Sequence, residues 1–447
     1  MADLTPTYPL PSHASLQLQY VGKKLEDLLT PAAIIDRAVV RTNCNAMLDV
    51  CGKLGVGFRA HVKSHKLQTL ELAKLQVGSE GPANFIVSTL AEGENLLPFL
   101  LACQGNGRES SVLYGVPIAQ SAVPRLLRLA SKLVPGSVNI LIDNIEAFQK
   151  VHTQLGSTKI GVFIKIDTGY NRAGIKTSSS KFPDLVKAVV ERVGDSFRGF
   201  YSHFGHSYGG NSEDDAAHGL IAELQGLQEA VGAVPKGFSG RLVLTVGATP
   251  TATAAQNMLS HSPRAGEFQE LLGSLKEKYT IELHAGVYPL LDMQQIATHA
   301  RPTTGTAPLS KESVGMKVLL EVSSVYDERE KPEALVSAGS LALGREPCKS
   351  YPGWGILTNE LGNTVNKVYD ERGDKTGWIV GRISQEHGIL TWEGPRAHMK
   401  PLEIGAKVLV WPNHACVAGA GFGWYLIVDS ENGGDTVVDI WVRWRGW

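Results

Sequence analysis

The sequence predicts an α/β fold in which a (β/α)8 TIM barrel is followed by a mostly antiparallel β domain. Three observations lead to this fold class. The chain has 447 residues, which is more than one hydrophobic core usually covers, so two domains are expected. Eight short apolar runs alternate with helix-like segments between residues 57 and 285. After about residue 300, strand-like runs follow one another without a long helical stretch.

The eight apolar runs are rich in β-branched and aromatic residues, as buried parallel strands are. Segments between them, such as residues 119–133 and 182–193, carry apolar residues at helical spacing. Eight strand–helix units over roughly 230 residues match the usual size of a TIM barrel, and an open doubly wound sheet is the alternative. The predicted barrel strands are residues 57–62, 84–89, 111–116, 138–143, 160–167, 197–204, 241–247 and 280–285.

The later part of the chain predicts strands that pair with one another. The segment 30–55 precedes the barrel as one strand and one helix, and its strand is a candidate to pair with the β domain. We therefore expect an N-terminal extension (1–29), a barrel domain (30–300) and a β domain (301–447). The predicted strands of the β domain lie in residues 315–327, 333–340, 377–384, 406–415, 423–429 and 436–447.

Composition excludes several classes of partner. The net charge is −1 and no basic block is present, so we expect no nucleic-acid partner. No run approaches the roughly 18 apolar residues of a membrane helix. The first twenty residues lack the basic start and apolar stretch of a secretory signal. Five scattered cysteines are typical of reduced thiols, and the expected location is cytoplasmic.

Chemistry in a TIM barrel takes place at the carboxyl ends of the strands. The first predicted strand ends in "HVKSHK" (61–66), which places Lys63 at that edge. Small residues after the seventh and eighth strands would let backbone amides approach a phosphate closely. A lysine that faces a phosphate site indicates an imine-forming amine with a phosphorylated aldehyde. The other strand ends carry "DTGYNRAG" (167–174), "HFGHSY" (203–208), "VGATPT" (246–251) and "HAGVY" (284–288).

Each of these side chains also has a purely structural interpretation. The lysines could be solvated charges, the histidines buried and hydrogen-bonded, the tyrosines packed, the arginine ion-paired and the glycines required only by backbone geometry. Any one motif alone is weak, whereas the ordered set is specific. The residues with such an alternative are Lys63, Lys66, Tyr170, Arg172, His203, His206, Tyr208, Gly247, Gly286 and Tyr288.

As an ordered set, and together with "PNHAC" (412–416), these motifs resemble the alanine-racemase-like class of pyridoxal-phosphate enzymes. From about residue 25 to the C-terminal region, the chain resembles the eukaryotic-type D-serine dehydratase family, which is related to D-threonine aldolase. The resemblance implies pyridoxal 5'-phosphate as cofactor, a homodimer and a small D-3-hydroxy amino acid as substrate. It implies that Lys63 is the Schiff-base lysine and that Arg172 lies beside the phenolic oxygen of the cofactor.

Further cofactor contacts are implied by the same resemblance. Tyr170, His206 and Tyr208 are expected to contact the cofactor or the substrate. Racemases of this class place an arginine near the pyridine nitrogen, whereas the equivalent position here is His284, which leaves the partner of that nitrogen open. The residues that match the phosphate-binding loops are Gly247, Ala248, Thr249, Gly286 and Val287.

The late motif predicts a metal site. If it lies on a β-strand, His414 and Cys416 project to the same face and can bind one ion. Imidazole with thiolate favours Zn2+, whereas the related aldolases are expected to pair histidine with a carboxylate for manganese or similar ions. The cysteine therefore favours the dehydratase. The structural alternative is a half-buried strand with a core cysteine. In "SQEHGIL" (384–390), Glu386 and His387 are candidates to line the site.

The expected reaction is the dehydration of D-serine to pyruvate and ammonia, possible also with D-threonine or 3-hydroxy-D-aspartate. Lys63 would remove the α-proton, and zinc would assist departure of the β-hydroxyl as a Lewis acid. One alternative is a metal-dependent D-threonine aldolase, which yields glycine and an aldehyde. The other is a non-catalytic pyridoxal-phosphate carrier. Such carriers are typically a barrel alone, so the long C-terminal region argues against that alternative.

Overall fold

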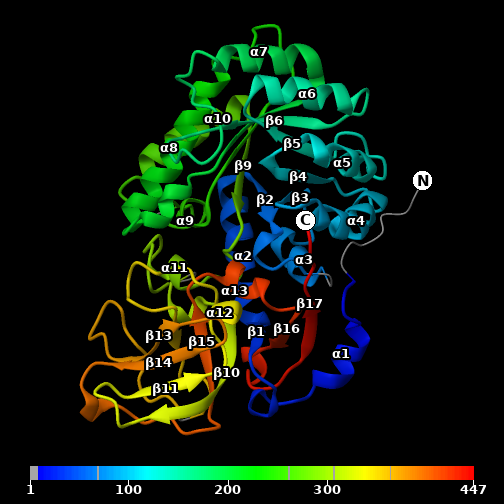
Figure 1. The fold of residues 1–447 in the computed structure, drawn as a ribbon. Helices are drawn as coiled ribbons and strands as arrows, with labels where there is room; N and C mark the ends of the chain where they lie inside the picture. Colours follow the sequence, from blue (N-terminus) through cyan, green and yellow to red (C-terminus); the bar gives the residue numbers. More distant parts are fainter. Residues whose placement is uncertain (1–8, 68–69, 260–261, 306–307, 363) are drawn as a thin grey trace.

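The computed structural model describes residues 9–67, 70–259, 262–305, 308–362 and 364–447. A barrel surrounded by helices lies above a second body made mainly of strands (Figure 1). Within the described residues, no helix combines the length and the hydrophobicity needed to cross a membrane.

Eight parallel strands close into a barrel, which confirms the TIM-barrel prediction and excludes the open sheet. The interior between the strands is filled by large side chains, among them Leu113, Phe163 and Tyr201. This is a packed core rather than a pore, as the fold requires. The barrel strands are β2 (Gly57–His61), β3 (Ala83–Val87), β4 (Ser110–Pro117), β5 (Val138–Ile142), β6 (Gly161–Ile166), β7 (Phe197–Ser202), β8 (Val243–Val246) and β9 (Thr280–Ala285).

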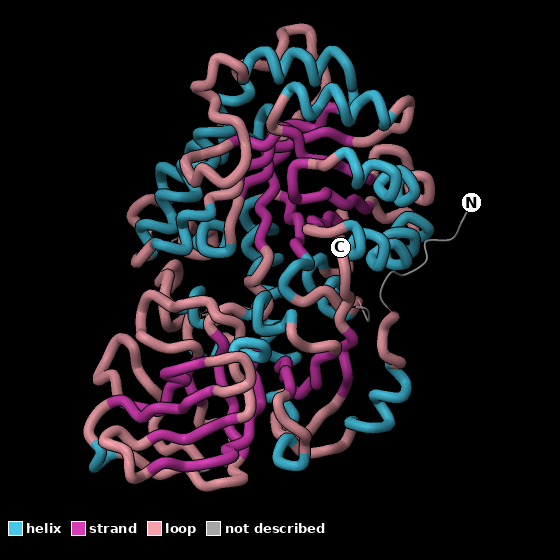
Figure 2. Tube along the Cα trace, viewed as in Figure 1, coloured by secondary structure: helices cyan, strands magenta, loops and turns pink. Residues whose placement is uncertain are grey.

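Helices surround this barrel, as the tube view shows (Figure 2). Their starts follow ordinary capping chemistry. For example, the Ser212 side chain accepts a hydrogen bond from Asp215 N, and three acidic residues occupy the first turn of the helix that follows. The barrel helices are α3 (Glu71–Val77), α4 (Leu90–Gly105), α5 (Val123–Ala130), α6 (Ile145–Leu155), α7 (Phe182–Val193), α8 (Glu213–Val231), α9 (Thr249–Ala254) and α10 (Ala265–Lys278), whereas the short helix α11 (Met293–Ile296) packs beside the β domain (Figure 1).

The second body is built on one nine-stranded sheet of order β11-β14-β13-β12-β15-β10-β1-β16-β17. All pairings in it are antiparallel except that of β1 with β16, which confirms the predicted β domain. Strands β12 and β14 lie outside the predicted runs. The strands after the barrel are β10 (Met316–Tyr326), β11 (Glu333–Val336), β12 (Gly355–Leu357), β13 (Gly377–Ile383), β14 (Gly388–Glu393), β15 (Lys407–Pro412), β16 (Trp424–Val428) and β17 (Asp439–Val442), with short helices α12 (Ser340–Leu343) and α13 (Ala415–Ala420).

Two segments connect the barrel to the β domain. Strand β1 (Ala32–Asp36) precedes the barrel in sequence but pairs with β10 and β16, as the sequence suggested. Helix α2 (Arg37–Leu54) then leads to β2, while α1 (His13–Tyr20) lies against β17. At the other end of the chain, Trp444 N donates to Lys66 O. The C-terminal segment therefore lies directly on the loop that follows β2.

Candidate active site

Lys63 lies immediately after β2, in a short 3-10 turn (Val62–Ser64). The turn is fixed on both sides of the lysine. His61 Nδ1 accepts a hydrogen bond from Lys63 N (3.4 Å), and Ser64 Oγ donates to Gly286 O (2.8 Å). Within the described part of the chain, the Lys63 ammonium makes neither a hydrogen bond nor an ion pair. A fixed backbone with an unpaired amine is what a reactive lysine needs.

The second lysine of the cluster has a different role. Lys66 Nζ lies 2.9 Å from Glu92 Oε1, and the Glu92 side chain is 1% exposed. His65 is buried and its Nε2 lies 2.8 Å from Gln76 Oε1. These two residues are therefore structural, because each is engaged with a buried partner. Lys63, by contrast, lines a cavity.

That cavity has a volume of about 330 Å3 and lies where the barrel meets the β domain. The barrel contributes strand-end residues, and the β domain contributes the loop that precedes α13 and the segment after α12. The structure thus brings together Lys63, Arg172, His414 and Cys416, which the sequence places far apart. The lining residues are Lys63, Tyr170, Arg172, His203, Tyr208, Val287, Gln294, Ala297, Glu346, Pro347, Lys349, His414 and Cys416.

Burial and nearby positive charges hold His203, on the barrel side of the cavity, in its neutral form. Burial, followed by the charges of Arg172 and Lys63, lowers the pKa of His203 well below its usual value. His203 Nδ1 lies 2.9 Å from Gly247 O. Because a carbonyl only accepts, this nitrogen carries the proton and Nε2 is left as an acceptor. Burial, followed by the charge of Arg172, also lowers the pKa of Lys165 to about 8.

His284 lies deeper in the barrel. Its ring stacks on Tyr201 with centroids 4.3 Å apart, and its Nδ1 lies 2.9 Å from Thr245 Oγ1. Burial, followed by the charge of Lys165, lowers the pKa of His284 well below its usual value. Its Nε2 is buried and has no hydrogen-bond partner among the described residues. A neutral imidazole with one free nitrogen is suited to hydrogen-bond a ligand atom.

In each of the two predicted phosphate loops, one backbone N–H group already donates a hydrogen bond to a side chain of the protein. Gly247 N donates to Glu223 Oε1 (3.1 Å), and Val287 N donates to Thr249 Oγ1 (3.2 Å). Thr249 also hydrogen-bonds Tyr208 through its side chain and its backbone, while burial raises the pKa of Tyr208. We therefore expect an anion to contact Tyr208, Thr249 and the backbone around Gly286.

Position 286 lies close to the Lys63 side chain. A β-carbon at Gly286 would lie 3.0 Å from Lys63 Cε and 3.5 Å from His61 Cβ. The loop after β9 therefore packs directly against the lysine side chain. This close approach, the unpaired Lys63 amine and the surrounding cations fit an anionic cofactor that bonds to a lysine.

The predicted strand through His414 and Cys416 is wrong. Strand β15 ends at Pro412, His414 caps the helix and Cys416 lies in the first turn of α13. Strand alternation therefore cannot be why the two side chains meet. They meet because the chain turns into a helix, and a hydrogen bond joins them. Both line the cavity, and the buried His414 Nδ1 atom has no hydrogen-bond partner in the described part of the chain.

The donor set fits a zinc ion with open positions. Burial opposes protonation of His414, but the hydrogen bond and charge of Cys416, followed by Asp292 and Glu346, raise its pKa to about 9. An imidazole and a thiolate side by side are ligands that zinc prefers. No group of three or more His, Cys, Asp or Glu side chains in the described ranges is arranged to hold a metal. Water or substrate would therefore complete the coordination.

The backbone around His414 is fixed by buried polar side chains. Asn413 Nδ2 donates to Glu346 O (2.9 Å) and Gly353 O (2.7 Å), and its Oδ1 accepts from Tyr351. On the other side, Ala415 N donates to Asp292 Oδ2 (2.9 Å). Asn413 and Asp292 are both 1% exposed. They position the His414–Cys416 pair without facing the cavity themselves.

Some predicted residues lie apart from the cavity lining. His206 is exposed, with its ring centroid 6.0 Å from that of Tyr170. Glu386 and His387 are exposed in the turn between β13 and β14. Tyr288 is buried and packs edge-on against Phe58, so it is a packing residue, as the structural alternative for the tyrosines predicts. Cys44, Cys51 and Cys103 are buried, and no disulfide involves them.

Several site residues were not anticipated from the sequence. Glu223 is fully buried and ties the ends of β7 and β8 together by accepting from Ser202 Oγ, Gly247 N and Thr251 Oγ1. The segment after α12 adds Glu346 and Lys349 to the cavity wall. These residues have no local motif. Only the closure of the barrel and its contact with the β domain bring them to the site.

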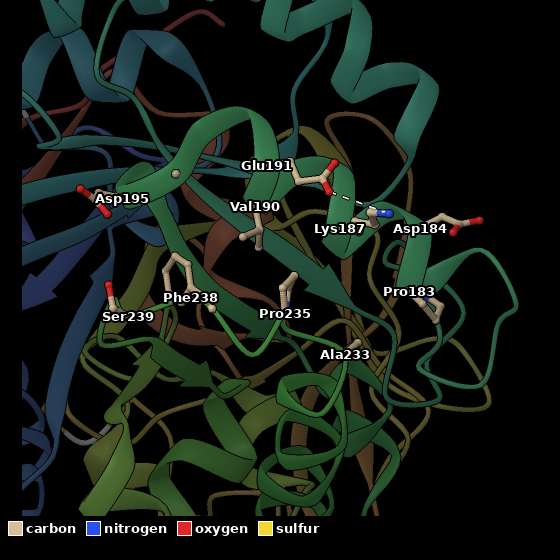
Figure 3. A pocket seen from close by; sticks show the side chains of 12 residues that line it. Pro183, Asp184, Lys187, Val190, Glu191, Asp195, Ala233, Pro235, Phe238 and Ser239 are labelled. Atoms are coloured by element: carbon tan, nitrogen blue, oxygen red, sulfur yellow. Dashed lines mark ion pairs between the residues drawn. The ribbon is translucent and has the colours of Figure 1, made fainter.

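A hollow on the outside of the barrel is larger, at about 550 Å3, but lies elsewhere (Figure 3). It is formed by α7 and the segment before β8, with Val190 and Phe238 in its lining. Its charged groups include Lys187 and Glu191, whose charged atoms are 3.9 Å apart. Asp195 and Ser239 precede strands β7 and β8, so the hollow is at the amino ends of the strands, away from the Lys63 cavity.

Comparisons with known proteins agree with this architecture. Residues 35–268 match the model of the alanine racemase N-terminal domain, and residues 315–428 match that of the "Putative serine dehydratase domain". A D-serine dehydratase of Schizosaccharomyces pombe is 36% identical over 97% of this chain and 95% of its own length. The chain belongs to the D-serine dehydratase family. The resemblance drawn from the motifs is therefore confirmed.

Other relatives of the family support the same assignment. The D-serine dehydratase of Saccharomyces cerevisiae is 31% identical over 96% of this chain and 99% of its own length. The solved structure of D-threo-3-hydroxyaspartate dehydratase from Delftia sp. HT23 is 26% identical and has a TM-score of 0.74, covering 95% of this chain and all of that chain.

Proposed function

We propose that this protein removes water from D-serine to form pyruvate and ammonia, with pyridoxal 5'-phosphate and Zn2+ as cofactors. The observation that carries the proposal is the shared cavity. An unpaired lysine from the barrel and a histidine–cysteine pair from the β domain line the same space of about 330 Å3. One substrate molecule can therefore reach a base with its α-carbon and a metal with its β-hydroxyl.

Residues of the barrel would hold the organic cofactor. Lys63 would bind it covalently, Arg172 would lie beside its phenolic oxygen and Tyr170 would lie at the cavity edge. Tyr208, Thr249 and the loops at Gly247–Ala248 and Gly286–Val287 would surround its phosphate. The neutral His284, with its free Nε2, is the partner that we assign to the pyridine nitrogen. When bound, pyridoxal phosphate withdraws electrons from the α-carbon of an amino acid.

Lys63 would act as the base in the elimination. Its Nζ lies in the cavity without a partner among the described residues, so a proton from the substrate α-carbon can be taken up there. His203 Nε2 would accept a hydrogen bond from the bound substrate or its ammonium group, because His203 is neutral.

His414 and Cys416 would hold the metal. Zinc would supply Lewis acidity toward the β-hydroxyl, which is otherwise a poor leaving group. The aldolase alternative is disfavoured by the thiolate, because carboxylates suit harder ions. Two further solved structures, each of a D-threo-3-hydroxyaspartate dehydratase, carry alanine in place of a cysteine and of a histidine two positions before it, and the cysteine variant is in the metal-free form. The spacing of His414 and Cys416 is the same.

The reaction products distinguish a dehydratase from an aldolase. Purified protein is supplied with pyridoxal phosphate and zinc and is given D-serine or D-threonine separately. We expect a keto acid and ammonia from D-serine. Glycine and acetaldehyde from D-threonine, with no keto acid from either substrate, would replace the dehydratase by an aldolase.

A further inference from the structure

Glu346 is the one carboxylate among the described residues that line the cavity. Three cationic side chains, Lys63, Arg172 and Lys349, line the same space. Those cations can attract the α-carboxylate that every amino acid carries, so they do not discriminate among amino acids. A single carboxylate in an otherwise cationic site can discriminate among substrates by repelling a second negative charge. Which part of the substrate it repels depends on where the carboxylate lies.

The position of Glu346 is fixed beside the metal pair. Asn413, which directly precedes His414, donates from its side chain to Glu346 O (2.9 Å). The following residues are anchored as well, because Gln294 Nε2 donates to Pro347 O (2.8 Å) and the buried Cys348 lies against Met293 O. Glu346, His414 and Cys416 line the same cavity, so the carboxylate shares its space with the metal pair.

Under the proposed function, the β-hydroxyl of the substrate lies at His414 and Cys416. Any other group on the same carbon is then brought toward Glu346. D-serine has only hydrogens there, and D-threonine has a methyl group. A 3-hydroxy-D-aspartate has a carboxylate, which would face a like charge at short range in a partly buried site.

We propose that Glu346 selects the substrate class: it admits D-3-hydroxy amino acids with an uncharged β-carbon and rejects those with a β-carboxylate. The inference rests on the proposed function, because that function places the β-carbon at the metal pair. Glu346 contacts the variable part of the substrate rather than the reacting bonds.

The test compares the loaded wild-type enzyme with Glu346→Gln and with the control Glu386→Gln, whose side chain is exposed and outside the cavity lining. The measured quantity is the ratio of kcat/KM for D-serine to kcat/KM for D-threo-3-hydroxyaspartate. We expect this ratio to fall about 10- to 100-fold in Glu346→Gln and to keep its wild-type value in Glu386→Gln. An unchanged ratio in Glu346→Gln, or an equal fall in both variants, overturns the inference.

A second readout does not depend on turnover. D-Alanine and D-aspartate lack a leaving group, and their dissociation constants can be obtained from the absorbance of the bound cofactor. Glu346→Gln should tighten D-aspartate relative to D-alanine by about tenfold. If the relative affinities stay the same, the inference is rejected. A wild-type protein that forms no keto acid from D-serine would reject the proposed function, and this binding comparison would still judge Glu346.

Discussion

Gly286 and Lys63 follow the neighbouring strands β9 and β2, and a β-carbon at position 286 would lie 3.0 Å from Lys63 Cε. This relationship joins the loop after the last barrel strand to the lysine after the first. A side chain at position 286 would therefore push on the Lys63 side chain, although Gly286 has no unusual backbone angle. The Lys63 side chain occupies space that a side chain at position 286 would otherwise take.

Gly286→Ala should therefore displace the Lys63 amine. We expect kcat/KM for D-serine to fall by tenfold to about 100-fold, because small displacements of reacting groups have effects of that size. The cofactor absorbance should also change, since the lysine is its point of attachment. Gly266→Ala is the matched control, because nothing lies within 4 Å of a β-carbon at that helical position. Equal activity in both variants would contradict the contact.

The two lysines of "HVKSHK" should behave differently when each is replaced by alanine. Lys63→Ala should lose covalent attachment of the cofactor and at least about 100-fold in turnover. Lys66→Ala should keep the attachment but lose about 3 kcal/mol or more of unfolding free energy, because Glu92 would stay buried without its partner. Absorbance spectra and denaturant unfolding measure the two effects. The opposite pattern, with attachment lost in Lys66→Ala and stability lost in Lys63→Ala, would contradict both roles.

Asn413→Ala should weaken the metal site without removing a ligand. The substitution frees the carbonyls of Glu346 and Gly353 and the Tyr351 hydroxyl from their common partner. We expect a loss of about 10- to 100-fold in zinc affinity, as for other residues that orient metal ligands. Asn366→Ala, which removes an exposed hydrogen bond to His398 O, is the control. Zinc titration measures both variants, and equal affinities would show that Asn413 is not a positioning residue.

Glu223 should make stability depend on pH. Burial raises its pKa from 4.5 to about 7, against the hydrogen bonds that it accepts. Between these values the folded protein holds a proton that the unfolded chain has released. The stabilisation is therefore present below about pH 4.5 and is lost as the pH rises to about 7. Glu223→Gln has no such titration.

The difference in unfolding free energy between wild type and Glu223→Gln should therefore decline as the pH rises from 5 to 8, by on the order of 3 kcal/mol. Denaturant unfolding of both proteins at the two pH values measures this difference. A difference that grows with pH would mean that the donors Gly247 N and Thr251 Oγ1 stabilise the carboxylate more than burial disfavours it.

The barrel was predictable from the sequence because its strands are local, continuous apolar runs. Each predicted run overlaps one observed strand, and the ends differ by a few residues, as at β8 (Val243–Val246) against the predicted 241–247. Strand β12 has only three residues, Gly355–Leu357, and a run of that length carries too little pattern to be recognised. Strand β14 follows a polar turn and begins with a glycine, so its pattern is weak as well.

Site residues that directly follow a barrel strand were predictable from the sequence. Residues that only tertiary packing brings to the site were not. Lys63 and Arg172 belong to the first kind. Glu223 lies in the middle of α8 and reaches the site only because that helix packs on the ends of β7 and β8. His414 and Cys416 do lie together, but not by strand periodicity, because the chain turns into α13 after Pro412.

The most direct test of the central claim is keto acid formation from D-serine by the enzyme loaded with pyridoxal phosphate, measured before and after zinc is removed by a chelator and then restored. Pyruvate and ammonia should appear, chelation should abolish their formation and zinc should restore it, with no restoration in Cys416→Ala. Pyruvate formation that persists at the same rate in the zinc-free enzyme would contradict the role of His414 and Cys416 as metal ligands.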